Sequence, residues 1–416
     1  MTPNKTLRLI AACTGLLAAA AQAAPDAKLL AAAEKAQPAL IESLKEMVLI
    51  ESGSTDLDGL ARMAALLDGR LKALGFKTER HRTGNSADTV VGTLQGSGKA
   101  RIMLMAHMDT VYPKGILESQ PYKVDGNKIF GPGIADAKGG IAVILQSLQI
   151  LLESGWRDFA TLTVLFDPDE ETGSPSSGEL ISKLGDQHDT VLSFEPSAPI
   201  SVFKVHSLML GGHAGFAKAT LEVKGRAAHA GVAPQNGRNA VVELAHQLLQ
   251  TRDIAKEVPG TQLSWTQLRA DKPINQIPDV AVAYGDVRFL QRGVEDKLLD
   301  ALKAKIASSK LVPDTETSIT LDINRPAFVP GERGRALFEK SKAIYEELGR
   351  FPLVGAPMSG GYTNAGLAAR SGKAAVLESL GLPGWGYHAK DEYVEADGIV
   401  PRLYLTTRLL VELGKP

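Results

Sequence analysis

Two histidines and a set of carboxylates in this chain follow short apolar runs or glycine-rich loops, and both kinds of side chain bind divalent cations. The candidates are His107, Asp136, the pair Glu170-Glu171, Glu195 and His388. If one glutamate of the pair is a ligand, five ligands can hold two ions and the other glutamate is free to act as a base. This set matches the components of a two-metal hydrolase.

Each candidate taken alone also has a structural explanation. A lone histidine after a strand is more often part of the core than a ligand. Asp136 could cap a helix, and Glu170-Glu171 could form a solvated acidic turn. The prediction of a metal site therefore depends on the neighbours of these residues and on their common placement.

Acidic neighbours favour metal binding at two places. Asp109 follows His107 at i+2, on the same face of a strand, so its carboxylate can accept the imidazole N–H and fix the metal-binding tautomer. Four carboxylates lie within residues 167–171, and they repel one another unless a cation is present. A bound zinc ion lowers the pKa of its water to roughly 7, so a neighbouring carboxylate can take the proton.

The strand pattern places most of these residues at one edge of a sheet. Apolar runs at residues 102–105, 162–166 and 191–194 alternate with helical patterns such as residues 141–152. This order predicts a parallel sheet with helices on both faces. Ligands bind beyond the carboxyl ends of such strands, and His107, Glu170-Glu171 and Glu195 fall there.

The middle of the chain has a different pattern. Residues 213–325 alternate in the β-α-β-β-α-β order of the ferredoxin-like plan. The predicted strands are 219–223, 262–268, 280–287 and 318–323, and the predicted helices are 239–249 and 294–306. Because this segment separates Glu195 from His388, we predict that it is inserted into a first domain comprising residues 24–212 and 326–416.

Around these regions, apolar spacing predicts further elements of the first domain. They are helices at residues 40–50, 60–74 and 399–413 and strands at 89–94 and 374–377. The predicted fold class is therefore α/β, with a mixed, mostly parallel sheet between helices, plus an inserted α+β domain. A length of 416 residues with 44% apolar content is sufficient for two such cores.

The N-terminus has the pattern of a signal peptide. Lys5 and Arg8 precede an apolar stretch at residues 9–20, and Ala21-Gln22-Ala23 is a cleavage site, so residues 1–23 should be removed. A buried core helix is the alternative, and the stretch is too short for a membrane span. We predict a periplasmic or secreted product without a membrane span. Cys13, the only cysteine, leaves with the signal, so the mature protein has no disulfide.

Net charge excludes one class of partner. The chain carries a formal charge of −1 and has no basic block, which argues against nucleic acid.

Together these segments resemble the M20 family of zinc peptidases, and most closely the bacterial glutamate carboxypeptidases of the folate-hydrolysing type. The resemblance covers nearly the whole mature chain and includes residues 377–384. It rests on the motifs His107-Met108-Asp109, Gly133 to Gly140, Asp169-Glu170-Glu171, Ser193-Phe194-Glu195-Pro196 and Tyr387-His388.

The resemblance implies a role for each residue of the site. Asp136 bridges two Zn²⁺ ions, His107 and Glu195 complete one metal site, and Glu171 and His388 complete the other. Glu170 is the general base and later the acid for the leaving amine.

The resemblance also implies that the inserted domain is a lid through which a homodimer forms. His229 of this domain would polarise the scissile carbonyl, and Asn275 would bind substrate. Arg288 and Arg325 are candidates to grip a terminal carboxylate, a task suited to bidentate arginine, although both could instead form ion pairs on a strand face. Gly360, in a glycine-rich loop of the first domain, is a further substrate-binding candidate.

The chain departs from the family pattern in three places. Ala137 follows the bridging aspartate where a second acidic residue is usual. Tyr362 and Asn364 alter the family's Gly-Gly-Thr-Asp loop, and Met209 indicates a more apolar specificity pocket. None of these changes removes a ligand, but all of them can alter the choice of substrate.

We therefore predict an exported dizinc carboxypeptidase whose substrate ends in glutamate or in an aromatic or apolar residue. An N-acyl-amino-acid deacylase or dipeptidase of the same fold is the alternative. A non-catalytic binding protein is a remote one, since such a protein would be marked by loss of Glu170 or of a ligand, and all are present.

Overall fold

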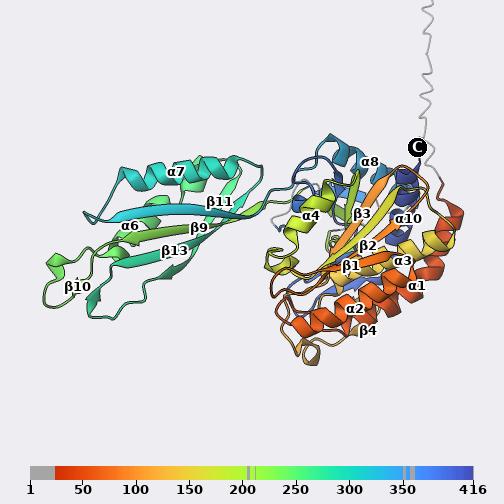
Figure 1. Ribbon diagram of the computed structural model, residues 1–416, viewed down its shortest axis with the longest axis horizontal. Coiled ribbons are helices and arrows are strands. Elements are labelled where there is room, and N and C mark those ends of the chain that lie inside the picture. The colour runs from red at the N-terminus through yellow and green to blue at the C-terminus, as the bar shows by residue number, and fades with distance from the viewer. Residues whose placement is uncertain (1–23, 204–206, 211, 350–352, 357–360, 416) are drawn as a thin grey trace, which may run out of the picture.

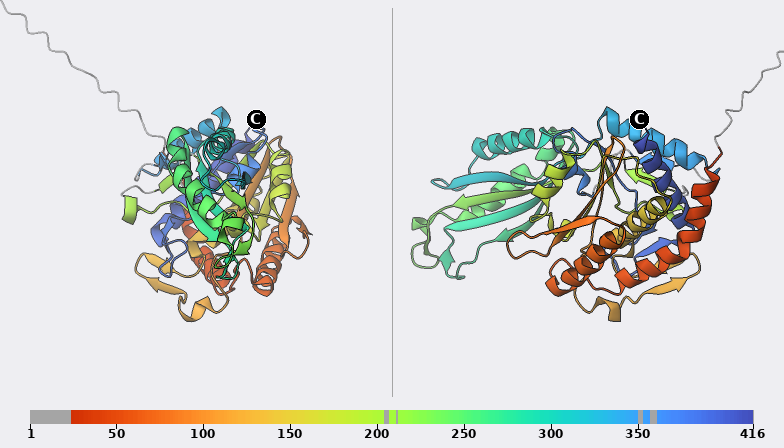
Figure 2. Two further views of the ribbon diagram at one scale, coloured as in Figure 1. Left: turned by 90° about the vertical axis from the view of Figure 1, so that its left-hand side faces the viewer. Right: turned by 45° about the vertical axis from the view of Figure 1, so that its right-hand side comes forward.

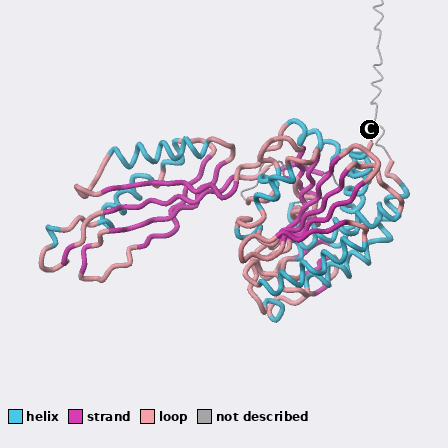
Figure 3. Tube along the Cα trace, viewed as in Figure 1, coloured by secondary structure: helices cyan, strands magenta, loops and turns pink. Residues whose placement is uncertain are grey.

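The computed structural model describes residues 24–415 apart from 204–206, 211, 350–352 and 357–360. The predicted signal peptide, including Cys13, lies outside the described residues, as does Gly360. Within them the chain forms a layered α/β body and an elongated α+β body made from its middle third (Figures 1 and 3).

A six-stranded sheet forms the centre of the α/β body. Its strands lie in the order β1-β2-β6-β3-β7-β16. Strands β6, β3, β7 and β16 are parallel, whereas β1 and β2 add antiparallel pairings at one edge. The prediction of a mixed, mostly parallel sheet is confirmed. The strands are β1 Lys77–His81, β2 Thr89–Gln95, β3 Arg101–His107, β6 Thr161–Asp167, β7 Thr190–Ser193 and β16 Ala375–Leu377.

Helices cover both faces of this sheet, as predicted. One face carries α1 Ala27–Val48, α2 Leu57–Ala73, α3 Gly140–Glu153, α8 Glu332–Glu346 and α10 Ile399–Gly414. The other face carries the short α4 Gly178–Gly185 and α9 Ala365–Ala368. Strand β3 shows why both helix layers are needed. Leu104 packs towards the layer that contains α3, whereas Met103 and Met105 pack towards the layer that contains α4 and α9.

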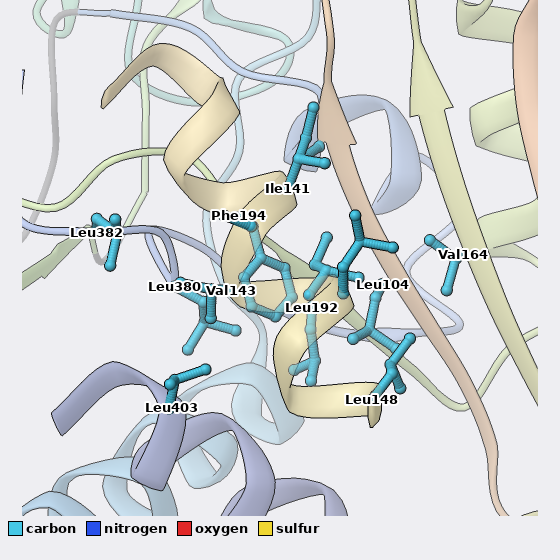
Figure 4. Close-up of a cluster of buried hydrophobic side chains, with 14 of the residues drawn as sticks. Leu104, Ile141, Val143, Leu148, Val164, Leu192, Phe194, Leu380, Leu382 and Leu403 are labelled. Atoms are coloured by element: carbon cyan, nitrogen blue, oxygen red, sulfur yellow. The ribbon is translucent and has the colours of Figure 1, made fainter. Parts of the chain in front are cut away.

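The larger core lies between the sheet and α3. Leu104, Val164 and Leu192 from three strands face Ile141, Val143 and Leu148 of α3, with Leu403 of α10 behind (Figure 4). The helix begins against the end of β7, since a Cβ added at Gly140 would lie 1.9 Å from the Phe194 carbonyl oxygen. The glycine thus permits close contact next to Glu195.

Among the described residues, the stretch Ile134–Glu153 has the length and apolar composition of a membrane span. In its most apolar window, however, 89% of the residues are buried inside the molecule. A helix that is apolar all round is typical of the core of a layered fold, so packing on the main sheet accounts for this stretch.

Several short elements were not predicted. Strands β4 Lys123–Asp125, β5 Lys128–Phe130, β17 Gly384–Trp385 and β18 Tyr393–Glu395 form a small sheet in the order β17-β18-β5-β4. A second pair joins β8 Ser207–Leu210 to β15 Leu353–Ala356 in parallel, and the four-residue helix α5 spans Ile200–Phe203. Strands of two to four residues carry too little periodicity to be recognised from sequence. The small sheet places the loop of His388 beside the loop of Asp136.

The inserted domain has the predicted ferredoxin-like order. Its antiparallel sheet runs β11-β13-β9-β14, and helices α6 and α7 pack on one face with a hydrophobic core of their own. Short strands β10 Ala228–His229 and β12 Gln276–Ile277 pair nearby. The main elements are β9 Gly215–Lys224, α6 Ala240–Thr251, β11 Thr261–Arg269, β13 Val280–Phe289, α7 Val294–Ser308 and β14 Glu316–Arg325. The domain extends away from the main sheet in Figure 1 and in the right-hand view of Figure 2. The domain boundaries at residues 213 and 325 stay a proposal.

The two connections to the inserted domain are held together by paired backbone hydrogen bonds. His213 N–H donates to the Phe328 carbonyl over 3.0 Å, and Phe328 N–H donates to the His213 carbonyl over 3.1 Å. The His213 ring is fully buried, and its Nδ1 donates to the Ala214 carbonyl. Burial lowers the pKa of His213 to about 4, and the charge of Arg325 acts in the same direction.

This buried histidine should make the fold acid-sensitive. An unfolded histidine titrates near pH 6.5, so between about pH 6.5 and pH 4 the unfolded chain binds a proton that the folded protein excludes, and stability falls as pH drops. His213→Gln should reduce the slope of the unfolding free energy against pH by up to about 1.4 kcal/mol per pH unit. Urea midpoints at pH 7 and pH 5 measure it. The exposed His81→Gln is the control, and an equal slope in all three proteins would contradict the prediction.

Candidate metal centre

The five side chains predicted as ligands converge on one point of the structure. Asp136 Oδ1 lies 2.9 Å from His107 Nε2, and Asp136 Oδ2 lies 3.5 Å from His388 Nε2. Glu195 Oε2 is 3.5 Å from His107 Nε2, and Glu171 Oε2 is 3.2 Å from His388 Nε2. Each oxygen of Asp136 therefore faces a different histidine–glutamate pair.

The sheet edge accounts for three of these positions. His107 is the last residue of β3, and Glu195 follows β7, which pairs with β3 in parallel. Glu171 lies in a 3-10 turn, Glu170–Thr172, that follows β6 on the other side of β3. Asp136 and His388 come instead from loops, one in the irregular helical turn Ile134–Gly139 and one between β17 and β18.

The pKa shifts in the cluster show an excess of negative charge around the two histidines. Burial alone would lower the pKa of His107, but the charge of Glu195 and hydrogen bonds to the neighbouring carboxylates raise it well above its ordinary value. Hydrogen bonds to Asp136 and Glu171 raise the pKa of His388 to about 10. For Asp136, burial opposes ionisation, yet the bonds to both histidines lower its pKa. The carboxylates around the two imidazoles thus favour a positive charge at this point of the structure.

This donor set fits divalent metal ions. Ligand atoms of His107, Asp136 and Glu171 all lie within 4.8 Å of one another. Imidazole nitrogen and carboxylate oxygen are typical zinc ligands. The assignment of individual ligands stays a prediction, with which this geometry agrees.

Asp109 has a larger role than the sequence indicated. Its Oδ1 lies 3.3 Å from His107 Nδ1, and its backbone carbonyl accepts from the same nitrogen over 3.0 Å. The same carboxylate accepts the N–H of Glu170 over 3.1 Å, the N–H of Glu171 over 3.2 Å and the Ser54 hydroxyl over 2.7 Å. Asp109 therefore fixes His107 and the glutamate loop together and is a positioning residue.

Glu170 is buried beside the cluster. Its Oε1 accepts no hydrogen bond from the described residues but lies 3.5 Å from Arg325 Nη2 in an ion pair. Burial raises its pKa well above the ordinary value, and the negative charge of Glu195 acts in the same direction. A buried carboxylate whose protonated form is favoured in this way is suited to accept a proton and to return it.

The crowding of acidic residues in the 167–171 loop is relieved largely by hydrogen bonds. Asp169 accepts from the Ser176 N–H and hydroxyl, each over 2.6 Å, and from the Ser177 hydroxyl over 2.5 Å. Asp167 accepts from Asn364 Nδ2 over 3.0 Å. The prediction that these carboxylates need a cation is therefore wrong for Asp169. For Asp167 the repulsion remains, because burial and the charges of Asp169 and Asp109 raise its pKa.

Arg325 occupies a position different from the predicted one. Its side chain is fully buried, and its guanidinium donates to the Glu170 carbonyl, the Ser174 hydroxyl and Asn364 Oδ1, each over 2.9 Å. It therefore holds the glutamate loop instead of presenting itself to a substrate, which corrects the predicted role. The amide of Asn364 both accepts from Arg325 and donates to Asp167, whereas an ionised aspartate could only accept.

Arg288 lies where the two domains meet. It pairs with Asp286 through two hydrogen bonds of 2.8 and 2.9 Å, the strand-face ion pair that the sequence left open. Its guanidinium is also 4.7 Å from the ring centre of Phe216 and 5.6 Å from that of Tyr362. The two rings stack at 5.9 Å, so Tyr362 contributes an aromatic surface at the domain junction.

His229 and Asn275 lie together but apart from the metal ligands. Ala230 N–H donates to the Asn275 carbonyl over 2.9 Å, and β10 lies at the end of the inserted domain farthest from the main sheet (Figure 1). The N–H groups of Gly231 and Val232 both donate to His229 Nδ1 over 3.2 Å. Because Nδ1 accepts, Nε2 of the neutral ring carries the hydrogen and can donate.

Comparisons with known proteins concern the chain as a whole. The model of peptidase family M20/M25/M40 matches residues 103–412. Carboxypeptidase G2 of Pseudomonas sp. (strain RS-16) is 42% identical over 392 residues, covering 94% of this chain and 92% of that protein. Succinyl-diaminopimelate desuccinylase 1 of Alteromonas mediterranea is 27% identical, covering 91% and 98%.

Solved structures confirm the fold class. The M20 metallo-carboxypeptidase Sso-CP2 from Sulfolobus solfataricus superposes with a TM-score of 0.70 at 16% identity, covering 90% of this chain and 99% of that one. Aminopeptidase PepT from Bacillus cereus gives 0.71 at 20% identity, covering 91% and 99%. At these identities the likeness concerns the fold alone.

Proposed function

The chain belongs to peptidase family M20/M25/M40 and is a metallocarboxypeptidase, and from this premise we propose that it is an exported dizinc enzyme. It would hydrolyse the amide bond to the C-terminal residue of a small substrate with a free carboxylate. The observation that carries the proposal is Asp136, each of whose oxygens faces a separate histidine–glutamate pair beside the buried Glu170.

In this proposal the protein groups hold the ions and move one proton. His107, Asp136, Glu171, Glu195 and His388 would hold two zinc ions, which when bound polarise a carbonyl group and promote attack by water. Glu170 would accept the proton of the attacking water on a carboxylate oxygen. It would then donate that proton to the amine nitrogen as the C–N bond breaks, leaving an acid and a free amino acid.

The C-terminal residue of the substrate is glutamate or an aromatic or apolar residue in this proposal. Likeness to carboxypeptidase G2 supports the carboxypeptidase reaction, and the stacked rings of Phe216 and Tyr362 near Arg288 support an aromatic side chain. A deacylase or dipeptidase of the same fold is the alternative, favoured by likeness to a desuccinylase. Initial rates on N-acyl and N-benzoyl amino acids ending in Glu, Asp, Phe, Leu and Lys distinguish these substrates, and no turnover of any would overturn the proposal.

Metal content is the direct test of the dizinc centre. Protein purified without chelator should contain about two zinc equivalents per chain, because two histidine–glutamate pairs share Asp136 as a bridging carboxylate. Dialysis against a chelator should abolish turnover, and added zinc should restore it. Elemental analysis together with rates measures both, and full activity in a chain without bound metal would contradict the proposal.

Export is proposed from the N-terminal pattern. If residues 1–23 are a signal peptide, the mature protein should begin at Ala24 and appear in the periplasmic or extracellular fraction. N-terminal sequencing of protein expressed from the full gene in a Gram-negative host measures this. Retention of Met1 in the cytoplasmic fraction would refute it.

A further inference from the structure

A buried carboxylate that the sequence did not single out lies behind the metal centre. Glu392 is fully buried, in the loop that also carries His388. Its Oε1 accepts the N–H groups of Ala135 and Asp136 over 2.8 and 3.0 Å. Its Oε2 accepts the N–H of Gly133 over 2.9 Å and lies 2.7 Å from the Tyr112 hydroxyl.

These contacts fix the backbone from which the bridging carboxylate projects. Three N–H groups within residues 133–136 point at one side chain, and one of them belongs to Asp136 itself. The Tyr112 hydroxyl lies 2.8 Å from the Ala389 carbonyl, next to His388, and Gly131 N–H donates to the Glu392 carbonyl over 3.3 Å. The loop of Asp136 and the loop of His388 are therefore held as one unit.

We propose that Glu392 is a positioning residue of the metal centre that sets the separation of Asp136 and His388, so that one cation can contact both. The inference rests on the proposed dizinc function. Partners behind metal ligands orient those ligands, and losing one typically weakens metal binding roughly 10- to 100-fold. Both oxygens of Glu392 accept these protein donors, so it would not itself be a metal ligand.

The substitution Glu392→Gln tests this role with little change of volume. An amide replaces one acceptor oxygen by an NH₂ group, which can only donate. Whichever way the amide is turned, this NH₂ group faces a backbone N–H of residues 133–136 that has lost its acceptor. The loop must then shift. Zinc affinity of the metal-free protein, measured by competition with a chelating dye, should fall roughly 10- to 100-fold.

Glu347→Gln is the matched control. Glu347 is likewise shielded from solvent and accepts a tyrosine hydroxyl, that of Tyr404. It lies at the C-terminal end of α8, and both Tyr404 and its ion-pair partner Arg408 lie in α10. A purely structural role predicts that both variants lower the unfolding temperature of the metal-free protein and leave zinc affinity unchanged. The positioning role predicts weaker zinc binding in Glu392→Gln alone.

Tyr112→Phe keeps the inference testable if Glu392→Gln does not fold. It removes one of the four donors, so zinc affinity should fall about fivefold, the value of one net hydrogen bond, whereas the control Tyr404→Phe should bind zinc normally. Wild-type zinc affinity in folded Glu392→Gln would overturn the inference about Glu392 but not the proposed function. If Glu392→Gln does not fold, wild-type zinc affinity in Tyr112→Phe would do the same. A wild-type protein that binds no zinc would instead overturn the proposed function.

Discussion

Glu170→Gln should lower kcat at least about 100-fold, the usual scale for loss of a general base. The amide keeps the shape of the side chain and the Glu170 backbone contacts with Asp109 and Arg325, but it cannot accept a proton. Zinc content should remain near that of the wild type, because the variant changes no predicted ligand. Steady-state kinetics with elemental analysis of the same samples measures both quantities.

The neighbouring glutamate provides the matched control. Glu171→Gln makes the same chemical change one residue away, at a side chain 3.2 Å from His388 Nε2, and should lose zinc as well as turnover. Separate effects on metal and rate would distinguish the base from the ligand. Wild-type turnover in Glu170→Gln would remove Glu170 from the mechanism.

Much of the fold could be predicted because local periodicity is strong in the long elements. The alternation of β9, β13 and β14 and the apolar runs of β3, β6 and β7 each reflect burial on one or both faces of a sheet. The same logic places His107 and Glu195 at one edge. The small sheet that contains β17 and β18 escaped prediction because its strands have only two or three residues each.

The supporting contacts of the site could not be predicted for a different reason. Glu392 and Asp136 are 256 residues apart in sequence. Arg325 and Glu170 are 155 residues apart. No spacing rule relates such pairs, and only the folded chain brings them together. Asp109 was recognised through its i+2 relation to His107, but its bonds to Glu170 and Glu171 depend on the pairing of β3 with β6.

Asn364 shows how a departure from the family pattern is accommodated. A carboxylate here would face Asp167, a buried aspartate whose pKa is raised by burial and by neighbouring acids. The amide instead donates to Asp167 and still accepts from Arg325 and Ser174. The substitution therefore preserves the support of the Glu170 loop, which is why an intact site can coexist with an altered motif.

His229→Ala should lower kcat about 10²- to 10³-fold, the typical cost of removing one oxyanion donor, without changing zinc content. Nδ1 of His229 accepts two backbone N–H groups, so Nε2–H is the group that would stabilise the negative oxygen. Since β10 lies far from the main sheet of its own chain (Figure 1), we expect His229 to act on the active site of a partner in a homodimer.

Mixing two inactive proteins tests action across the dimer. In a heterodimer of His229→Ala with Glu170→Gln, one site combines an intact Glu170 with an intact His229 from the partner. Random exchange of subunits at equal amounts should therefore restore about a quarter of wild-type activity, since half of the dimers are mixed and each has one complete site. A double variant carrying both changes, mixed with wild-type chains, controls for exchange itself. Mass spectrometry that shows exchange without recovery of activity would rule out action from the partner subunit, because no complete site would then have formed across the dimer.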